Sequence, residues 1–163
     1  MVSIKRWWIV AAATILGLVI LIPVAPAQQP YEALCCGSGT VTMLSASKEL
    51  TIVSLELRGI SQSLPTNKLF DNFTWHGVGL SRIVDGKAHW IMYRKYMDPD
   101  GDTIVLELTG VDQDGNLKFL EGTGKWQGIT GSGKAYLTTR GKPITPGTIQ
   151  YCGRSTGTYE LKK

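Results

Sequence analysis

The feature of this chain that most constrains its fold is a run of five glycines within the twelve residues from Gly122 to Gly133. Strand-like sequence lies on both sides of the run, and Trp, Ile, Thr and Lys residues stand between the glycines. Glycines spaced two to four residues apart allow strands to bend sharply or to approach another backbone closely. Such spacing is typical of the corners of a small closed barrel, so the sequence predicts a curved, all-β fold.

The rest of the chain after residue 27 reads as short strands separated by turns, with no long stretch at helical period. Turns such as Asp112-Gln113-Asp114-Gly115 contain Asp and Gly, which accept the left-handed backbone angles of tight hairpins. Tight hairpins join antiparallel neighbours, so we predict an eight-stranded antiparallel closed β-barrel. The expected strands are Gly39–Ala46, Leu50–Gly59, Phe73–Ile83, Lys87–Met97, Thr103–Gly110, Leu117–Gly122, Lys134–Thr139 and Gly147–Leu161.

The N-terminal segment has the pattern of a signal peptide. Lys5 and Arg6 form a short basic start, Trp7 to Val24 is an apolar run, and Ala25-Pro26-Ala27 is a small-residue cleavage site. We therefore predict a signal peptide over residues 1–27 and one β-barrel domain over residues 28–163, secreted or periplasmic. The apolar run of 18 residues also reaches the lower limit for a membrane-spanning helix, so a retained signal anchor is the alternative. After cleavage we expect no membrane association.

The charge pattern argues against nucleic-acid binding. The full chain carries a formal net charge of +4, of which Lys5 and Arg6 belong to the predicted signal peptide. The remaining Lys and Arg residues are scattered along the chain without the clustered basic face that phosphate neutralisation requires.

Three cysteines fit an oxidising compartment, where disulfides form and persist. Cys35 and Cys36 are adjacent near the start of the mature chain, and Cys152 lies in the last expected strand. Closing a barrel makes its first and last strands neighbours. We therefore expect a disulfide from Cys35 or Cys36 to Cys152. The alternative is that all three are small buried hydrophobic residues.

Two motifs that suggest cofactors have ordinary explanations. The run from Gly128 to Lys134 matches the first part of a phosphate-binding loop, but Ala135 stands where a hydroxyl should ligate magnesium. The residues that follow favour a strand, so no helix N-terminus would receive a phosphate. We expect no nucleotide and no other cofactor.

No metal site is expected either. Asp98, Asp100 and Asp102 could gather a calcium ion, but their spacing fails the EF-hand pattern, and we expect a hairpin turn with solvated carboxylates. His76 and His89 are the two histidines of the chain, whereas catalytic zinc ordinarily takes three protein ligands.

Two segments of the chain resemble a known family. Tyr96-Met97-Asp98-Pro99-Asp100-Gly101-Asp102, followed by a strand and then by Glu121 to Gly133, is similar to the C-terminal half of allene oxide cyclase/dirigent-like barrels, and especially to their uncharacterised secreted relatives. The resemblance implies an eight-stranded antiparallel barrel, often oligomeric, with an apolar lumen open at one end. Members of the wider group guide the cyclisation or coupling of reactive lipid or phenolic intermediates. The matching residues are scaffold glycines, and no catalytic residue of the group is carried over.

Alternation within the strands separates an inner from an outer face. In the strand from Thr103, Ile104, Leu106 and Leu108 oppose residues that include Glu107. In Lys87–Met97, both faces are aromatic: Trp90, Met92, Arg94 and Tyr96 share one, and His89, Ile91 and Tyr93 share the other. Such a strand can line a cavity on one side and a subunit contact on the other, although plain packing explains it as well.

We therefore expect a secreted barrel that binds a small apolar or aromatic ligand in its lumen. Aromatic side chains would supply contact area and charged groups would fix orientation; the candidate ligand-binding residues are His76, Trp90, Arg94, Tyr96 and Glu107. One alternative is a cyclase/dirigent-type isomerase or coupling auxiliary, with Arg94 or His76 polarising an oxygen and Glu107 as partner. The other is a structural or interaction protein with a filled barrel, for instance a homo-oligomer. No catalytic residue is assigned.

The state of the barrel interior distinguishes these alternatives. An interior filled by large side chains favours the structural role. An open lumen with two or more convergent polar groups favours ligand handling, and an open lumen without them favours passive binding.

Overall fold

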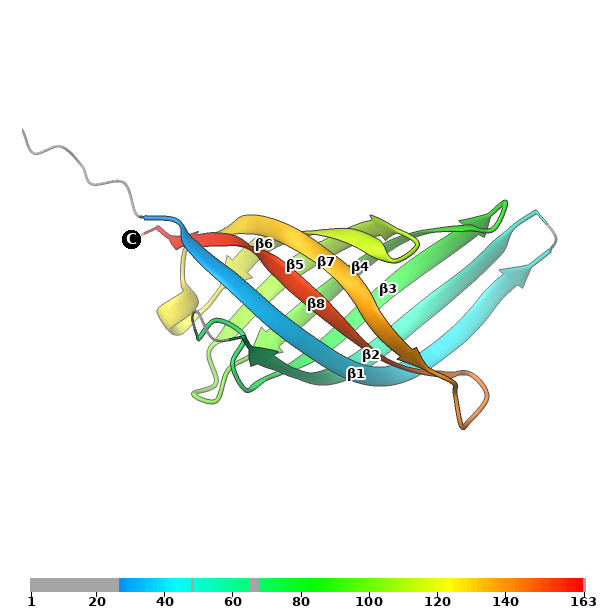
Figure 1. Ribbon diagram of the computed structural model, residues 1–163, viewed down its shortest axis with the longest axis horizontal. Coiled ribbons are helices and arrows are strands. Elements are labelled where there is room, and N and C mark those ends of the chain that lie inside the picture. The colour runs from blue at the N-terminus through cyan, green and yellow to red at the C-terminus, as the bar shows by residue number, and fades with distance from the viewer. Residues whose placement is uncertain (1–26, 48, 65–67, 163) are drawn as a thin grey trace, which may run out of the picture.

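The computed structural model describes residues 27–47, 49–64 and 68–162 (Figure 1). Residues 1–26 lie outside the described part of the chain, so the signal peptide and its cleavage site remain predictions. No helix among the described residues is long and apolar enough to cross a membrane.

Eight antiparallel strands form one closed barrel, as predicted, in which each strand pairs with its neighbours in sequence and β1 pairs with β8. The strands are β1 (Gln29–Ala46), β2 (Thr51–Ser63), β3 (Phe73–Val84), β4 (Lys87–Met97), β5 (Thr103–Val111), β6 (Asp114–Gly122), β7 (Ile129–Gly141) and β8 (Thr148–Leu161). A single 3-10 turn, η2 (Gly124–Trp126), lies between β6 and β7.

Several strands are longer than the sequence predicted. β1 begins at Gln29 rather than Gly39, and β7 begins at Ile129 rather than Lys134. The inward face of the added part of β1 carries Tyr31 followed by the small residues Ala33 and Cys35, and that of β7 carries Gly131 and Gly133 after Ile129, so the apolar alternation is weak in both segments. Gly133 shows why: a Cβ there would lie 2.2 Å from the Tyr31 hydroxyl, so only glycine allows β7 to pass this ring.

The disulfide between the first and last strands is confirmed and joins Cys36 to Cys152. These residues are direct partners in the β1–β8 register, with Cα atoms 4.1 Å apart, and they are 116 residues apart in the chain. Because successive strand residues point to opposite faces, Cys36 faces outward while Cys35 is a buried free thiol inside the barrel. In the chain-entropy model, a bridge closing so long a loop stabilises the fold by roughly 4 to 5 kcal/mol.

The two ends of the barrel differ. What we call the closed end carries both termini of the described chain, η2 and the β2–β3 and β4–β5 connections, as Figure 1 shows. The open end carries the β1–β2, β3–β4, β5–β6 and β7–β8 connections. A cluster of rings fills the closed end, with centroid separations of 4.8 Å to 6.5 Å: Tyr31, Phe70, Phe73, Tyr96, Phe119, Trp126 and Tyr159.

A polar clasp ties η2 to the β4–β5 turn at the closed end. The Asp98 carboxylate accepts hydrogen bonds from Trp126 Nε1 at 2.8 Å and from the backbone N–H groups of Asp100 and Asp102, and Lys125 Nζ lies 2.8 Å from it. Gly124, with φ +53°, lies so close to the Asp102 carboxylate that a Cβ would collide with it. We refer to this arrangement as the Asp98 clasp.

The clasp corrects the expectation of a turn with solvated carboxylates, because the Asp98 side chain is only 1% exposed. Burial opposes its ionisation, but the hydrogen bonds from Lys125 and Trp126 outweigh that effect and lower the pKa of Asp98 below its usual value. The two sequence segments that carry the family resemblance are therefore the two halves of this clasp.

Candidate ligand-binding lumen

The barrel is not filled: a cavity of about 740 Å³ occupies its interior towards the open end. Ligand sites in proteins typically enclose roughly 300 to 1,000 Å³. The wall is mainly aliphatic, and its apolar members include Val53, Leu55, Leu57, Ile83, Met92, Leu108, Leu117 and Ile149. The interior thus has room for one small apolar molecule.

Arg94 lies at the floor of this cavity, where the lumen meets the aromatic cluster. Its Nη2 donates a hydrogen bond to the Tyr151 hydroxyl at 2.6 Å, and its Nη1 donates one to the Tyr96 hydroxyl at 3.3 Å. Nε lies 3.2 Å from Met92 Sδ, and the guanidinium carbon is 4.4 Å from the centre of a Trp75 ring. These contacts hold the guanidinium in one orientation, facing the lumen.

Strand alternation explains how these groups come together. β4 directs Trp90, Met92, Arg94 and Tyr96 inward, as their shared face predicted, and β8 directs Tyr151 inward from the other side of the barrel. Cys35 on β1 completes the floor, with Sγ 3.6 Å from the Tyr96 hydroxyl. Tyr151 was missed from the sequence, although Ile149 two residues before it gave an alternation signal.

The floor carries a positive charge without a carboxylate beside it. Among the described residues, no Asp or Glu forms an ion pair with Arg94. Burial raises the pKa values of Cys35, Tyr96 and Tyr151, so all three are neutral at neutral pH. The guanidinium keeps its proton in proteins, and the floor therefore has a net charge of one positive unit.

Trp90 stands nearer the open end than Arg94 does. Its indole is partly buried against the core, and its Nε1 donates a hydrogen bond to the Asp112 carbonyl oxygen at 3.1 Å. This bond ties the ring to the β5–β6 turn and fixes a flat apolar surface at the cavity wall.

Two of the five candidate residues lie on the outside of the barrel, and the structure does not bring them to Arg94. His76 Nε2 is 3.1 Å from Glu56 Oε1, and the histidine side chain is 56% exposed. Glu107 accepts a hydrogen bond from the exposed Tyr93 hydroxyl at 2.9 Å. The physical reason is strand alternation: Trp75 and Leu106 point inward, so the residues that follow them point outward.

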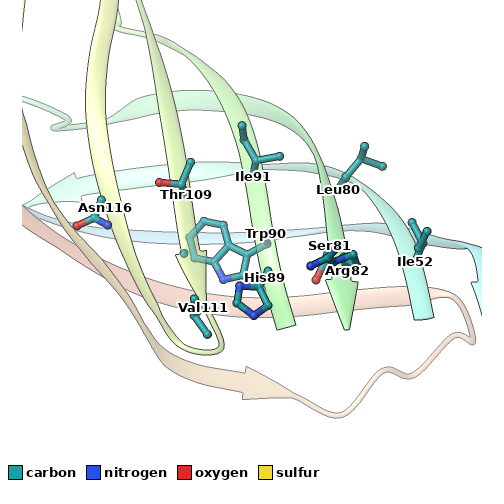
Figure 2. A pocket seen from close by; sticks show the side chains of 11 residues that line it. Ile52, Leu80, Ser81, Arg82, His89, Trp90, Ile91, Thr109, Val111 and Asn116 are labelled. Atoms are coloured by element: carbon teal, nitrogen blue, oxygen red, sulfur yellow. The ribbon is translucent and has the colours of Figure 1, made fainter. Parts of the chain in front are cut away.

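A second, shallower hollow of about 540 Å³ lies over the outer face of β2 to β6 near the open end. Figure 2 shows Ile52, Leu80 and Ile91 projecting from one side of the sheet, with His89 nearby. Leu80 is 50% exposed and Ile91 is 38% exposed, so this surface is apolar but open to solvent.

Comparisons by sequence find no relative: no family model matches the chain, and no curated protein matches it. By structure, the barrel is similar to the pterocarpan synthase dirigent protein GePTS1, with a TM-score of 0.53 over 85% of this chain and 94% of that chain. The chain has a dirigent-like β-barrel fold. The two sequences are 10% identical, so the likeness concerns the fold alone.

A second dirigent-like neighbour is the pterocarpan synthase dirigent protein PsPTS1, at 12% identity and a TM-score of 0.47, covering 84% of this chain and 97% of that chain. The closed barrel and its likeness to GePTS1 confirm the fold that the family resemblance implied. The activity of those proteins does not follow from it.

Proposed function

We propose that this dirigent-like barrel binds one small apolar or aromatic molecule in its lumen. The observation that carries the proposal is the open cavity of about 740 Å³, whose aliphatic wall ends in convergent polar groups at one floor. Trp90 would supply flat contact area, and Arg94 and Tyr96 would orient a polar group of the ligand. His76 and Glu107 are not part of the proposal because they lie outside the lumen.

We propose that the protein acts outside the cytoplasm and is either secreted or periplasmic. The Cys36–Cys152 disulfide supports this, since such bonds persist in oxidising compartments.

The second candidate is a cyclase/dirigent-type isomerase or coupling auxiliary, in which the barrel would shield a reactive intermediate from water. Arg94 with the Tyr96 and Tyr151 hydroxyls supports it, because these donors could stabilise charge that develops on an oxygen of the ligand. Both candidates require the lumen to hold a small molecule. Chemical conversion of the bound molecule would distinguish the second candidate from the first.

The proposal can be tested by placing a bulky side chain on the inner face of one strand, where it fills the lumen, and comparing it with the same side chain on the outer face. Leu55 on β2 lines the cavity, whereas the adjacent Ser54 points away from it. We expect thermal-shift screening against lipids and phenols, together with native mass spectrometry, to identify bound molecules. Leu55→Trp should abolish that binding, and the control Ser54→Trp should preserve it. An absence of bound molecules and of thermal shifts in the unaltered protein would contradict the proposal.

A further inference from the structure

Arg94 has hydrogen-bonding capacity left over. A guanidinium has five N–H groups, and its three contacts, to Met92 Sδ, Tyr96 and Tyr151, use one each on Nε, Nη1 and Nη2. One N–H therefore remains on each of the two terminal nitrogens. Arg94 lines the cavity, so a molecule in the lumen can reach these groups.

The electrostatics of the floor favour an anion. A positive charge among apolar walls interacts more strongly with an opposite charge than it would in water. The Trp75 ring and the two tyrosine hydroxyls stabilise the cation in part, but they carry no negative charge. Within the described chain no carboxylate ion-pairs with Arg94, and an anion bound in the lumen would supply a full counter-charge.

We propose that the ligand of the lumen is an organic carboxylate: one apolar body carrying a single negative charge, with the carboxylate bound at Arg94. This inference rests on the proposed function and specifies its ligand class. The planar fork of arginine matches the two oxygens of a carboxylate. The Tyr151 hydroxyl, which accepts a hydrogen bond from Arg94, keeps its own proton to donate to the same carboxylate.

The number of cations at the floor selects a monoanion. Arg94 is the one cationic side chain in the floor cluster with Tyr96, Tyr151 and Cys35, so a doubly charged phosphate monoester would leave one charge uncompensated. Arg140 also lines the cavity, on the strand that ends at the open end. Asp112 lines the same part of the cavity, so its carboxylate offsets the positive field that Arg140 adds along the path by which an anion would approach.

The test compares a carboxylic acid with its neutral ester. cis-Parinaric acid is a fluorescent conjugated fatty acid, and its methyl ester has the same apolar body without the charge. Binding of each probe to the full protein is measured by fluorescence titration at neutral pH. A charge-assisted fork contact should make the acid bind roughly tenfold to a hundredfold more tightly than the ester.

Variants test whether Arg94 is the source of the preference for the acid over the ester. Arg94→Met should reduce the affinity for the acid to that for the ester and leave the ester unchanged. Arg58→Met is the matched control, since Arg58 is 71% exposed on the outer face, and it should change neither affinity. If Arg94→Met does not fold, Tyr151→Phe keeps the charge, removes one donor, and should weaken acid binding alone by a few-fold.

The outcomes separate this inference from the proposed function. Equal binding of acid and ester to the unaltered protein would overturn the carboxylate assignment while leaving lumen binding intact. An acid preference that survives Arg94→Met would also overturn it. Binding of neither probe would count against both proposals, and tighter acid binding that Arg94→Met removes would support both.

Discussion

The closed and open ends of this barrel are built from the same eight strands, yet only one end is packed with side chains. At the closed end, Phe70 is 1% exposed and contacts the rings of Tyr31, Phe73, Tyr96 and Phe119. Towards the open end, Leu55, Trp90 and Ile149 are only partly buried and face the cavity. A barrel of this size therefore has binding space only where the chain supplies no aromatic cluster.

Connection length accounts for the difference. The β2–β3 connection at the closed end is long enough for Phe70 to enter the barrel, and η2 places Trp126 beside Phe73. Two of the open-end connections, β3–β4 and β5–β6, are two-residue turns. Asp112 and Gln113 of the β5–β6 turn border the cavity, but neither turn supplies an aromatic ring that could fill it.

The comparison predicts that truncating a closed-end side chain costs much more stability than truncating one at the open end. Phe70→Ala removes a fully buried ring and should lower the free energy of unfolding by about 3 to 5 kcal/mol. Ile149→Ala opens space beside an existing cavity and should cost about 1 to 2 kcal/mol. Urea unfolding followed by fluorescence measures both, and similar costs at the two ends would contradict the asymmetry.

A smaller effect is expected for two aspartates in turns at opposite ends. Asp98→Asn weakens the clasp around Trp126 and Lys125 and should cost about 1 to 3 kcal/mol. The Asp112 side chain accepts one hydrogen bond, from the Ala88 N–H, and the residue has φ +53°. Asn tolerates that conformation and keeps an acceptor, so Asp112→Asn should cost less than about 1 kcal/mol. Thermal unfolding of the two variants measures both losses of stability. A larger loss for Asp112→Asn than for Asp98→Asn would contradict this prediction.

Acid titration sharpens the Asp98 prediction. Folding lowers the pKa of Asp98, so its contribution to stability is present above the ordinary aspartate value of 3.8 and is lost as the pH falls through the lower folded value. The stability difference between the unaltered protein and Asp98→Asn should therefore be constant near neutral pH and shrink in acid. A stability difference that grows as the pH falls would contradict the lowered pKa of Asp98.

The smallest effect concerns a polar atom within the closed end. The Tyr31 hydroxyl is buried without a hydrogen-bond partner among the described residues, and it lies against Gly133. Removing such a group costs little, so Tyr31→Phe should leave stability unchanged or raise it by up to about 1 kcal/mol. Calorimetric unfolding would refute this if the variant were clearly less stable.

The sequence was sufficient for the barrel because its signals are local. Glycine spacing and Asp-Gly turns predicted eight antiparallel strands, and alternation within the fourth strand placed Trp90, Arg94 and Tyr96 on one shared face, which points inward in the structure. Closure of the barrel then predicted a disulfide to Cys152, although adjacency of Cys35 and Cys36 left the partner open. The β1–β8 register determines which cysteine faces Cys152, and this register is known only once the two strands are paired.

The candidate site was harder to predict because it joins strands that are distant in sequence. Tyr151 meets Arg94 only when the barrel closes, across a separation of 57 residues. His76 and Glu107 were chosen for their chemistry although alternation with their neighbours placed them outside. Phe70 lay in a segment that reads as a surface loop, and nothing local indicates that its ring enters the core.

A crystal structure of the protein with cis-parinaric acid would test this view of the molecule most directly. We predict one molecule in the lumen, its chain between Trp90 and Ile149 and its carboxylate within hydrogen-bonding distance of Arg94. A molecule bound only in the outer hollow beside Leu80 and Ile91, with the lumen closed by rearranged side chains, would contradict it.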